Sequence, residues 1–174
     1  RFDVASAIQA GRALEHVNLV WLEEPIHVEN HNALRQVREN VNVPLCIGER
    51  HFTRWDYVEL FRERLVDYVM PDIAWTGGIS ELKKISTMAE AYYVPVSPHD
   101  ASGPINILAG AHTMMAVPNL YRLEISSASF GLYGEMVSPA LDIQDGYLYL
   151  SDRPGLGVEL NMDFVEAHPD PDWH

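Results

Sequence analysis

Five acidic or histidine side chains follow short apolar runs of this sequence at nearly regular intervals. They are Glu23, Glu49, Asp72, His99 and Glu124, and successive members are 26, 23, 27 and 25 positions apart. A strand, a helix and two short loops together take about that length. Because parallel strands of a barrel present their carboxyl ends at one mouth, the pattern predicts that these five side chains gather in one site.

The first two members, Glu23 and Glu49, are predicted metal ligands. Carboxylate oxygens from separate strands suit a hard cation such as Mg²⁺, which keeps some coordination positions for water and substrate. The alternative is that each is an ordinary solvated loop acid. Glu24, directly after Glu23, is expected either to support the metal ligands or to pair with an arginine.

Asp72 and His99 end successive units and are predicted to form a pair. A carboxylate on one imidazole nitrogen fixes the tautomer and raises the basicity of the other nitrogen, so His99 is a candidate general base. Glu124 is a candidate proton-bearing acid that stabilises an anion formed during the reaction. The competing readings are a structural histidine and a surface carboxylate. The two lysines, Lys83 and Lys84, lie inside an expected helix, far from any strand end.

Five strand–helix units must position these residues. Asp3, Asn30 and Ser80 are expected at helix starts, and Trp55 is expected within the third helix. The expected strands cover 19–22, 44–47, 66–70, 94–97 and 120–123, and the expected helices cover 4–14, 30–39, 55–61, 80–92 and 103–116. An open doubly wound sheet would show the same alternation, but it would not usually place an acid or histidine at five successive strand ends.

The predicted fold is therefore α/β, part of a (β/α)₈ barrel, with residues 1–125 as a partial barrel domain. Residues 126–174 are expected to form a closing segment beside it. Within that segment the sequence predicts a loop over 130–138, a strand pair over 140–150 around Asp145-Gly146, and one helical turn near Phe164.

The composition of the chain argues against some classes of function. The 174 residues carry 12 Lys and Arg against 25 Asp and Glu, a net charge of −13, which argues against a nucleic-acid or anionic-membrane surface. No apolar run has transmembrane length. Cys46 is the only cysteine, so no intrachain disulfide can form; a buried thiol and a cytoplasmic location are expected.

Taken together, these residues resemble the enolase superfamily, and within it the mandelate racemase subgroup. An Asp72–His99 pair in place of a lysine at position 72 distinguishes this subgroup from the muconate-lactonizing branch. Acid-sugar dehydratases of the galactonate type are the most similar members, and mannonate dehydratases are more distant. The matching segments are 21–25 (WLEEP), 47–50 (IGER), 71–72 with 77–78, 97–99 (SPH), 122–124, 145–148 and 154–158.

The resemblance implies a reaction. Mg²⁺, held by Glu23 and Glu49, binds the carboxylate of an acid sugar. His99, tuned by Asp72, removes the adjacent proton, Glu124 supports the enediolate, and a β-hydroxyl leaves as water to give a 2-keto-3-deoxy acid. Four further residues are expected to face the small-molecule substrate: Arg50, His51, Trp75 and Asp100.

The family pattern is incomplete over these residues. Its third metal-ligand acid would fall just before Arg1, and its capping domain would also lie outside the sequence, so we expect the chain to be the C-terminal part of such an enzyme. We expect a homo-oligomer, and we do not expect these residues alone to form a stable active monomer. Two alternatives remain: a racemase or epimerase on the same fold, and a non-catalytic half-barrel.

Overall fold

A short parallel sheet forms the centre of the molecule in the computed structural model, which describes residues 1–126 and 130–169. Its strands, in order across the sheet, are β1 (Leu22–Glu23), β2 (Leu45–Ile47) and β3 (Tyr68–Val69). Two further segments extend the sheet through parallel bridges from Val69 to Val96 and from Val96 to Leu120. Five parallel segments thus lie side by side in chain order, as the sequence predicts for part of a barrel.

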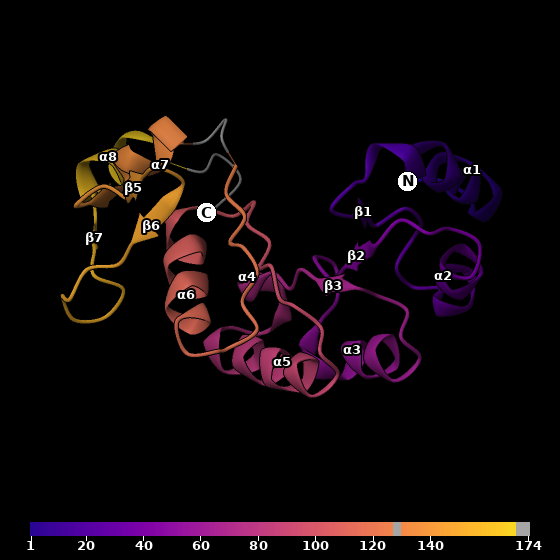
Figure 1. Ribbon diagram of the computed structural model, residues 1–174. Helices are drawn as coiled ribbons and strands as arrows, with labels where there is room; N and C mark the ends of the chain where they lie inside the picture. Colours follow the sequence, from indigo (N-terminus) through magenta and orange to yellow (C-terminus); the bar gives the residue numbers. More distant parts are fainter. Residues whose placement is uncertain (127–129, 170–174) are drawn as a thin grey trace.

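Helices cover one side of this sheet. Figure 1 shows them as an arc around its outer side, with α1 and the C-terminal elements at opposite ends. Neighbouring helices pack against each other, α1 on α2, α3 on α5, and α5 on α6. Their bounds are α1 Val4–Leu14, a 3-10 turn Glu15–Val17, α2 His31–Arg38, α3 Thr53–Arg62, α4 Ile73–Thr76, α5 Ile79–Ala91 and α6 Pro104–Met114.

Side-chain caps start two of the helices as the sequence predicts. An Asp3 carboxylate oxygen accepts from the Ser6 amide at 2.8 Å, and the Asn30 side-chain oxygen accepts from the Ala33 amide at 3.0 Å. The prediction of a Ser80 cap is wrong, because α5 starts earlier, after Gly78. Gly78 has φ of +87°, which glycine adopts freely, and this turn places Ser80 inside the first helical turn.

The core lies between the sheet and its helices. Leu45, Ile47 and Val69 from the strands are at most 1% exposed, and they belong to one apolar cluster with Phe61 of α3 and Ile85 of α5. Trp55, used above to mark the third helix, does lie in α3 but is 72% exposed. Cys46 is buried, as expected.

The chain after residue 126 forms smaller elements. The predicted loop over 130–138 is wrong: α7 and β4 occupy it, and α7 packs on α6 and α8. The predicted strand pair is confirmed as an antiparallel hairpin whose Asp145-Gly146 turn has φ of 51° and 82°. The bounds are α7 Phe130–Met136, β4 Val137–Ser138, β5 Asp142–Gln144, β6 Tyr147–Tyr149, β7 Glu159–Leu160 and α8 Met162–Ala167.

The helical turn expected near Phe164 is α8, and β4 pairs with β7 in a second antiparallel ladder. The predicted boundary between a barrel domain and a closing segment at residue 125 stays a prediction. Residues 127–129 and 170–174 of that closing segment lie outside the described residues. None of the helices in the described part of the chain is both long and apolar enough to span a membrane.

Candidate active site

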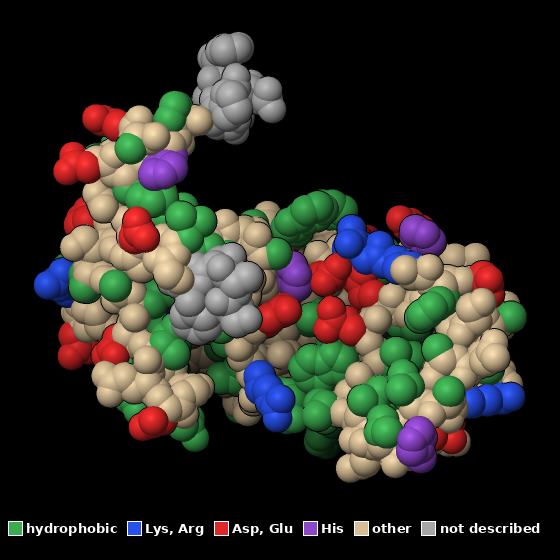
Figure 2. All heavy atoms as spheres, turned by 90° about the horizontal axis from the view of Figure 1, so that it is seen from above, with side chains coloured by type: hydrophobic (Ala, Val, Ile, Leu, Met, Phe, Trp, Pro, Cys, Tyr) green, Lys and Arg blue, Asp and Glu red, His purple; other side chains and the backbone are tan. Residues whose placement is uncertain are grey.

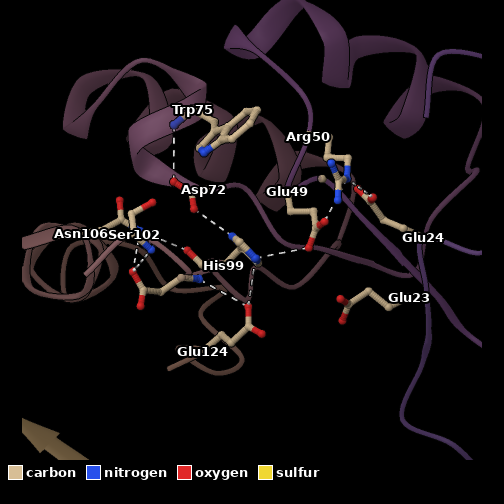
Figure 3. Close-up of polar contacts among 12 residues, drawn as sticks. Glu23, Glu24, Glu49, Arg50, Asp72, Trp75, His99, Ser102, Asn106 and Glu124 are labelled. Carbon is tan, nitrogen blue, oxygen red and sulfur yellow. Dashed lines mark hydrogen bonds and ion pairs between the residues drawn. The ribbon is translucent and has the colours of Figure 1, made fainter. Parts of the chain in front are cut away.

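Acidic side chains gather at the ends of the parallel segments, in the middle of the face shown in Figure 2. Figure 3 shows Glu49, Asp72, His99 and Glu124 converging there, with Glu23 and Glu24 to one side. The order of the strands explains the convergence, because each of these residues ends one of five adjacent parallel segments. The structure thus brings the five predicted residues to one edge of the sheet.

Asp72 and His99 form the hydrogen-bonded pair expected from the sequence. His99 Nδ1 lies 2.8 Å from Asp72 Oδ2, and a backbone bridge joins the same two residues. This hydrogen bond, opposed by partial burial and helped by the charges of Glu124 and Glu49, raises the pKa of His99 to about 9. The direction of this pKa shift is the one expected from the sequence.

Glu49 and Glu124 lie beside the other ring nitrogen. His99 Nε2 is 3.3 Å from a Glu49 oxygen and 4.0 Å from a Glu124 oxygen. Burial raises the pKa of Glu124, as do the charges of Glu23 and Glu49, while His99 opposes the shift. This is the direction expected for a carboxyl group that keeps its proton and donates it in a hydrogen bond.

Glu23 and Glu24 differ although they are adjacent. Glu23 is exposed, and Trp21 Nε1 donates to it at 3.1 Å. Glu24 is 5% exposed, with φ of 33°. Its pKa is raised to about 7, first by burial and then by the charge of Glu49, against the effect of Arg1. Arg50 Nε lies 3.3 Å from a Glu24 oxygen, so the expected pairing of Glu24 with an arginine is present.

Two arginines form ion pairs with the clustered glutamates. Arg50 Nε lies 3.1 Å from a Glu49 oxygen, and Arg1 contacts both Glu24 and Glu49. Arg50 was expected to face substrate, and in the structure its guanidinium bridges the two glutamates. The contribution of Arg1 was missed, because no local pattern around the first residue indicates which distant carboxylate it contacts.

The carboxylates suit a hard divalent cation by their chemistry. Glu23 and Glu49 follow the neighbouring parallel strands β1 and β2, and carboxylate oxygens are the ligand atoms that Mg²⁺ prefers. Among residues 1–126 and 130–169, no three His, Cys, Asp or Glu side chains are already grouped as ligands around one point. The chemistry of the two glutamates is compatible with metal binding, and their assignment as metal ligands stays a proposal.

A cavity of about 470 Å³ adjoins this cluster through Arg50, which lines the cavity and pairs with Glu24 and Glu49. Three of the four residues expected to face the substrate line it, namely Arg50, His51 and Trp75, together with Phe52, whose ring centroid lies 5.7 Å from that of Trp75. His51 is 3% exposed, and burial lowers its pKa to about 4. A cavity of this volume, lined by aromatic and polar side chains, suits a small hydroxylated molecule.

Asp100, the fourth expected substrate residue, does not line this cavity. It is 3% exposed, and its Oδ1 accepts from Asn106 Nδ2 at 2.9 Å and from the Ser102 and Gly103 amides at 3.4 Å each. Its backbone amide donates to Glu124 at 3.4 Å. The Asp100 carboxylate therefore stabilises the loop before α6. Its main side-chain partner is Asn106, a residue that the sequence alone did not indicate.

The chain is similar in sequence and fold to known proteins. Residues 1–164 match the family model described as "Enolase C-terminal domain-like". A D-xylonate dehydratase of Haloferax volcanii is 35% identical over 167 residues, which are 96% of this chain and 40% of that protein. A D-galactonate dehydratase family member of Streptomyces bingchenggensis is 37% identical over 171 residues, 97% of this chain and 41% of that protein.

Among solved structures, a mandelate racemase/muconate lactonizing enzyme-like protein from Rubrobacter xylanophilus superimposes with a TM-score of 0.92 at 41% identity. The match covers 98% of this chain and 44% of that one. The chain thus spans about two fifths of the length of the curated relatives it matches. With the family model covering nearly all of its residues, this chain belongs to the enolase C-terminal domain-like family, and it corresponds to the C-terminal barrel part of mandelate racemase-type proteins.

Proposed function

We propose that a protein carrying this chain is a Mg²⁺-dependent acid-sugar dehydratase of the galactonate type, acting in the cytoplasm as a homo-oligomer. The observation that carries the proposal is the Asp72–His99 hydrogen bond of 2.8 Å, with Glu49 and Glu124 beside the other ring nitrogen, Nε2. Two relatives, a D-xylonate dehydratase and a D-galactonate dehydratase family member, support the substrate class.

In this proposal each residue has one task. His99 acts in the neutral form of its ring, which a cation held by Glu49 would favour by offsetting one of the charges that raise the pKa of His99. Its Nε2 then takes the proton from the carbon next to the substrate carboxylate, and Asp72 holds the ring in the tautomer that has its proton on Nδ1. Protonated Glu124 donates a hydrogen bond to the enediolate. The β-carbon–oxygen bond then breaks as the hydroxyl takes the proton from His99 Nε2 and leaves as water, and the resulting enol tautomerises to a 2-keto-3-deoxy acid.

Glu23 and Glu49 would hold the metal ion. When bound, Mg²⁺ supplies positive charge that binds the substrate carboxylate and offsets the field of the two glutamates. Arg50, His51 and Trp75 would contact the hydroxylated chain of the substrate in the adjoining cavity. Asp100 would affect substrate binding only indirectly, by stabilising the loop before α6.

The test uses the protein expressed from its full reading frame, a panel of five- and six-carbon aldonates, and Mg²⁺. We expect a 2-keto-3-deoxy acid from at least one of them. Replacing the base, His99→Asn, should lower kcat by about 10² to 10⁴-fold, the range that general acid–base catalysis contributes.

The matched control is His16→Asn, an exposed histidine in the 3-10 turn Glu15–Val17, which should leave turnover unchanged. Exchange of the α-proton with all hydroxyls retained would indicate a racemase or epimerase instead. Equal turnover in wild type and His99→Asn would remove His99 from the reaction and favour a non-catalytic role.

A further inference from the structure

The side chain of Asn106, in the first turns of α6, touches two of the loops that carry the site. It is 8% exposed. Its Oδ1 accepts from the Ala74 amide at 3.1 Å, and its Nδ2 donates to Asp100 Oδ1 at 2.9 Å and to the His99 carbonyl at 3.4 Å. Because the Ala74 amide can only donate and the Asp100 carboxylate can only accept, these partners fix which end of the amide faces which loop.

On one side, Asn106 supports Asp72. The Ala74 amide that donates to Asn106 also donates to Asp72 Oδ1 at 2.8 Å, so one N–H is shared between the two side chains. The other oxygen, Asp72 Oδ2, holds His99 Nδ1. The orientation of the Asp72 carboxylate therefore depends on the start of α4, which Asn106 ties to α6.

On the other side, Asn106 supports the loop that follows His99. It holds the His99 carbonyl and the Asp100 carboxylate, while the Asp100 amide donates to Glu124. The ends of three parallel segments, at Asp72, His99 and Glu124, are thereby joined through one buried amide. A primary amide suits this place because it offers a donor and an acceptor at once, which an apolar side chain or a carboxylate does not.

We propose that Asn106 is a positioning residue that holds the Asp72–His99 pair and Glu124 in their reactive arrangement. The proposal rests on the proposed dehydration. Asn106 acts through His99, Asp72 and Asp100, and has no assigned contact with the substrate. Small displacements of a catalytic group cost about 10²-fold in rate, and loss of a supporting hydrogen bond around a site typically costs about 10- to 100-fold.

The experiment compares Asn106→Leu with Thr113→Val in the protein from the full reading frame. Thr113 is also buried on α6, but its hydroxyl bonds to Ala109 O within the helix, so this control removes a buried polar group without touching the loops. We expect Asn106→Leu to lower kcat about 10- to 100-fold with KM changed by less than about threefold. Thr113→Val should change both constants by less than about threefold. Asn106→Gln, which keeps both functions of the amide, should recover part of the loss.

A double-mutant cycle separates positioning from general destabilisation. In a His99→Asn background, adding Asn106→Leu should have no further effect on residual turnover, because the group it positions is absent. Equal losses in both backgrounds, or equal losses for Asn106→Leu and Thr113→Val, would overturn the proposal.

A spectroscopic measurement tests the positioning without relying on turnover. The His99 Nδ1 proton, bonded to Asp72, should give a downfield imidazole resonance in wild type and Thr113→Val that shifts or disappears in Asn106→Leu. If no aldonate is consumed while this change is seen, the dehydratase proposal fails and the positioning role stands. If the resonance is the same in all three proteins, the positioning role is wrong whatever the activity.

Discussion

The two oxygens of Asp72 have different tasks. Oδ2 holds the imidazole of His99, and Oδ1 accepts from the amides of Ala74 and Trp75 at the start of α4. Asp72 is buried, so its carboxylate is stabilised by these hydrogen bonds rather than by water. The cap therefore orients the same group that sets the protonation of the ring.

This arrangement predicts a pH-dependent stability. The pKa of His99 is raised to about 9 from an ordinary 6.5, so the stabilisation from the imidazolium is fully present below pH 6.5 and is lost as pH rises through 9. In chelator-treated protein, the free energy of unfolding of wild type should exceed that of His99→Gln most at pH 6, and the difference should shrink by pH 9.5. Denaturant titrations measure it, with His16→Gln as control. A difference that stays constant over this range would contradict the prediction.

At the scale of elements, the turn after β2 brings Glu49 to the site. Gly48 has φ of +147°, and a Cβ there would lie 3.0 Å from the Met70 amide nitrogen and 3.1 Å from the Met70 carbonyl carbon. The Gly48 carbonyl accepts from the buried Tyr57 hydroxyl at 2.8 Å, which ties the turn to α3. Met70 follows β3 directly, and its amide donates to the Ile47 carbonyl of β2 at 3.1 Å, so a shift of this backbone would disturb a hydrogen bond of the sheet.

Gly48→Ala should therefore destabilise the protein by about 1 to 3 kcal/mol through backbone strain and crowding against Met70. Thermal unfolding of the protein measures the loss. The control is Gly131→Ala in α7, where no heavy atom lies within 4 Å of the added Cβ and alanine favours the helix, so no loss is expected. Equal melting temperatures for Gly48→Ala and wild type would show that the turn relaxes.

At the scale of the whole molecule, the sheet has a second face. Successive strand residues point to opposite sides, so Tyr68 lies opposite Val69, which packs against the helices. The rings of Trp21 and Tyr121 gather around Tyr68, with centroids 5.3 and 5.0 Å away, and all three rings are only partly covered. In the described residues this apolar face has no layer packed over it that matches the layer of helices on the other side.

A polypeptide of these 174 residues should therefore self-associate. Sedimentation velocity should show species larger than the monomer, and a dye that binds exposed apolar surface should bind to this polypeptide. A monodisperse monomer that dehydrates an acid sugar would contradict both this prediction and the expectation that these residues alone are an incomplete site.

The sequence by itself determined the units and the residues at their ends. Alternating apolar runs and helical periodicity depend on near neighbours, as do the Asp3 cap and the Asp145-Gly146 turn, and the structure contains all of these. The regular spacing from Glu23 to Glu124 also indicated that their side chains share one edge of a sheet. Register and strand order then follow from the parallel repeat.

Tertiary structure decided which of these side chains meet. Glu49 rather than Glu23 lies beside His99, and Glu24 turns into the interior with a positive φ. Helix α7 forms despite two glycines, where it packs on α6 and α8. Asn106 reaches Ala74 across 32 positions. Contacts of this kind depend on side-chain direction and long-range packing, which local periodicity and propensity do not specify.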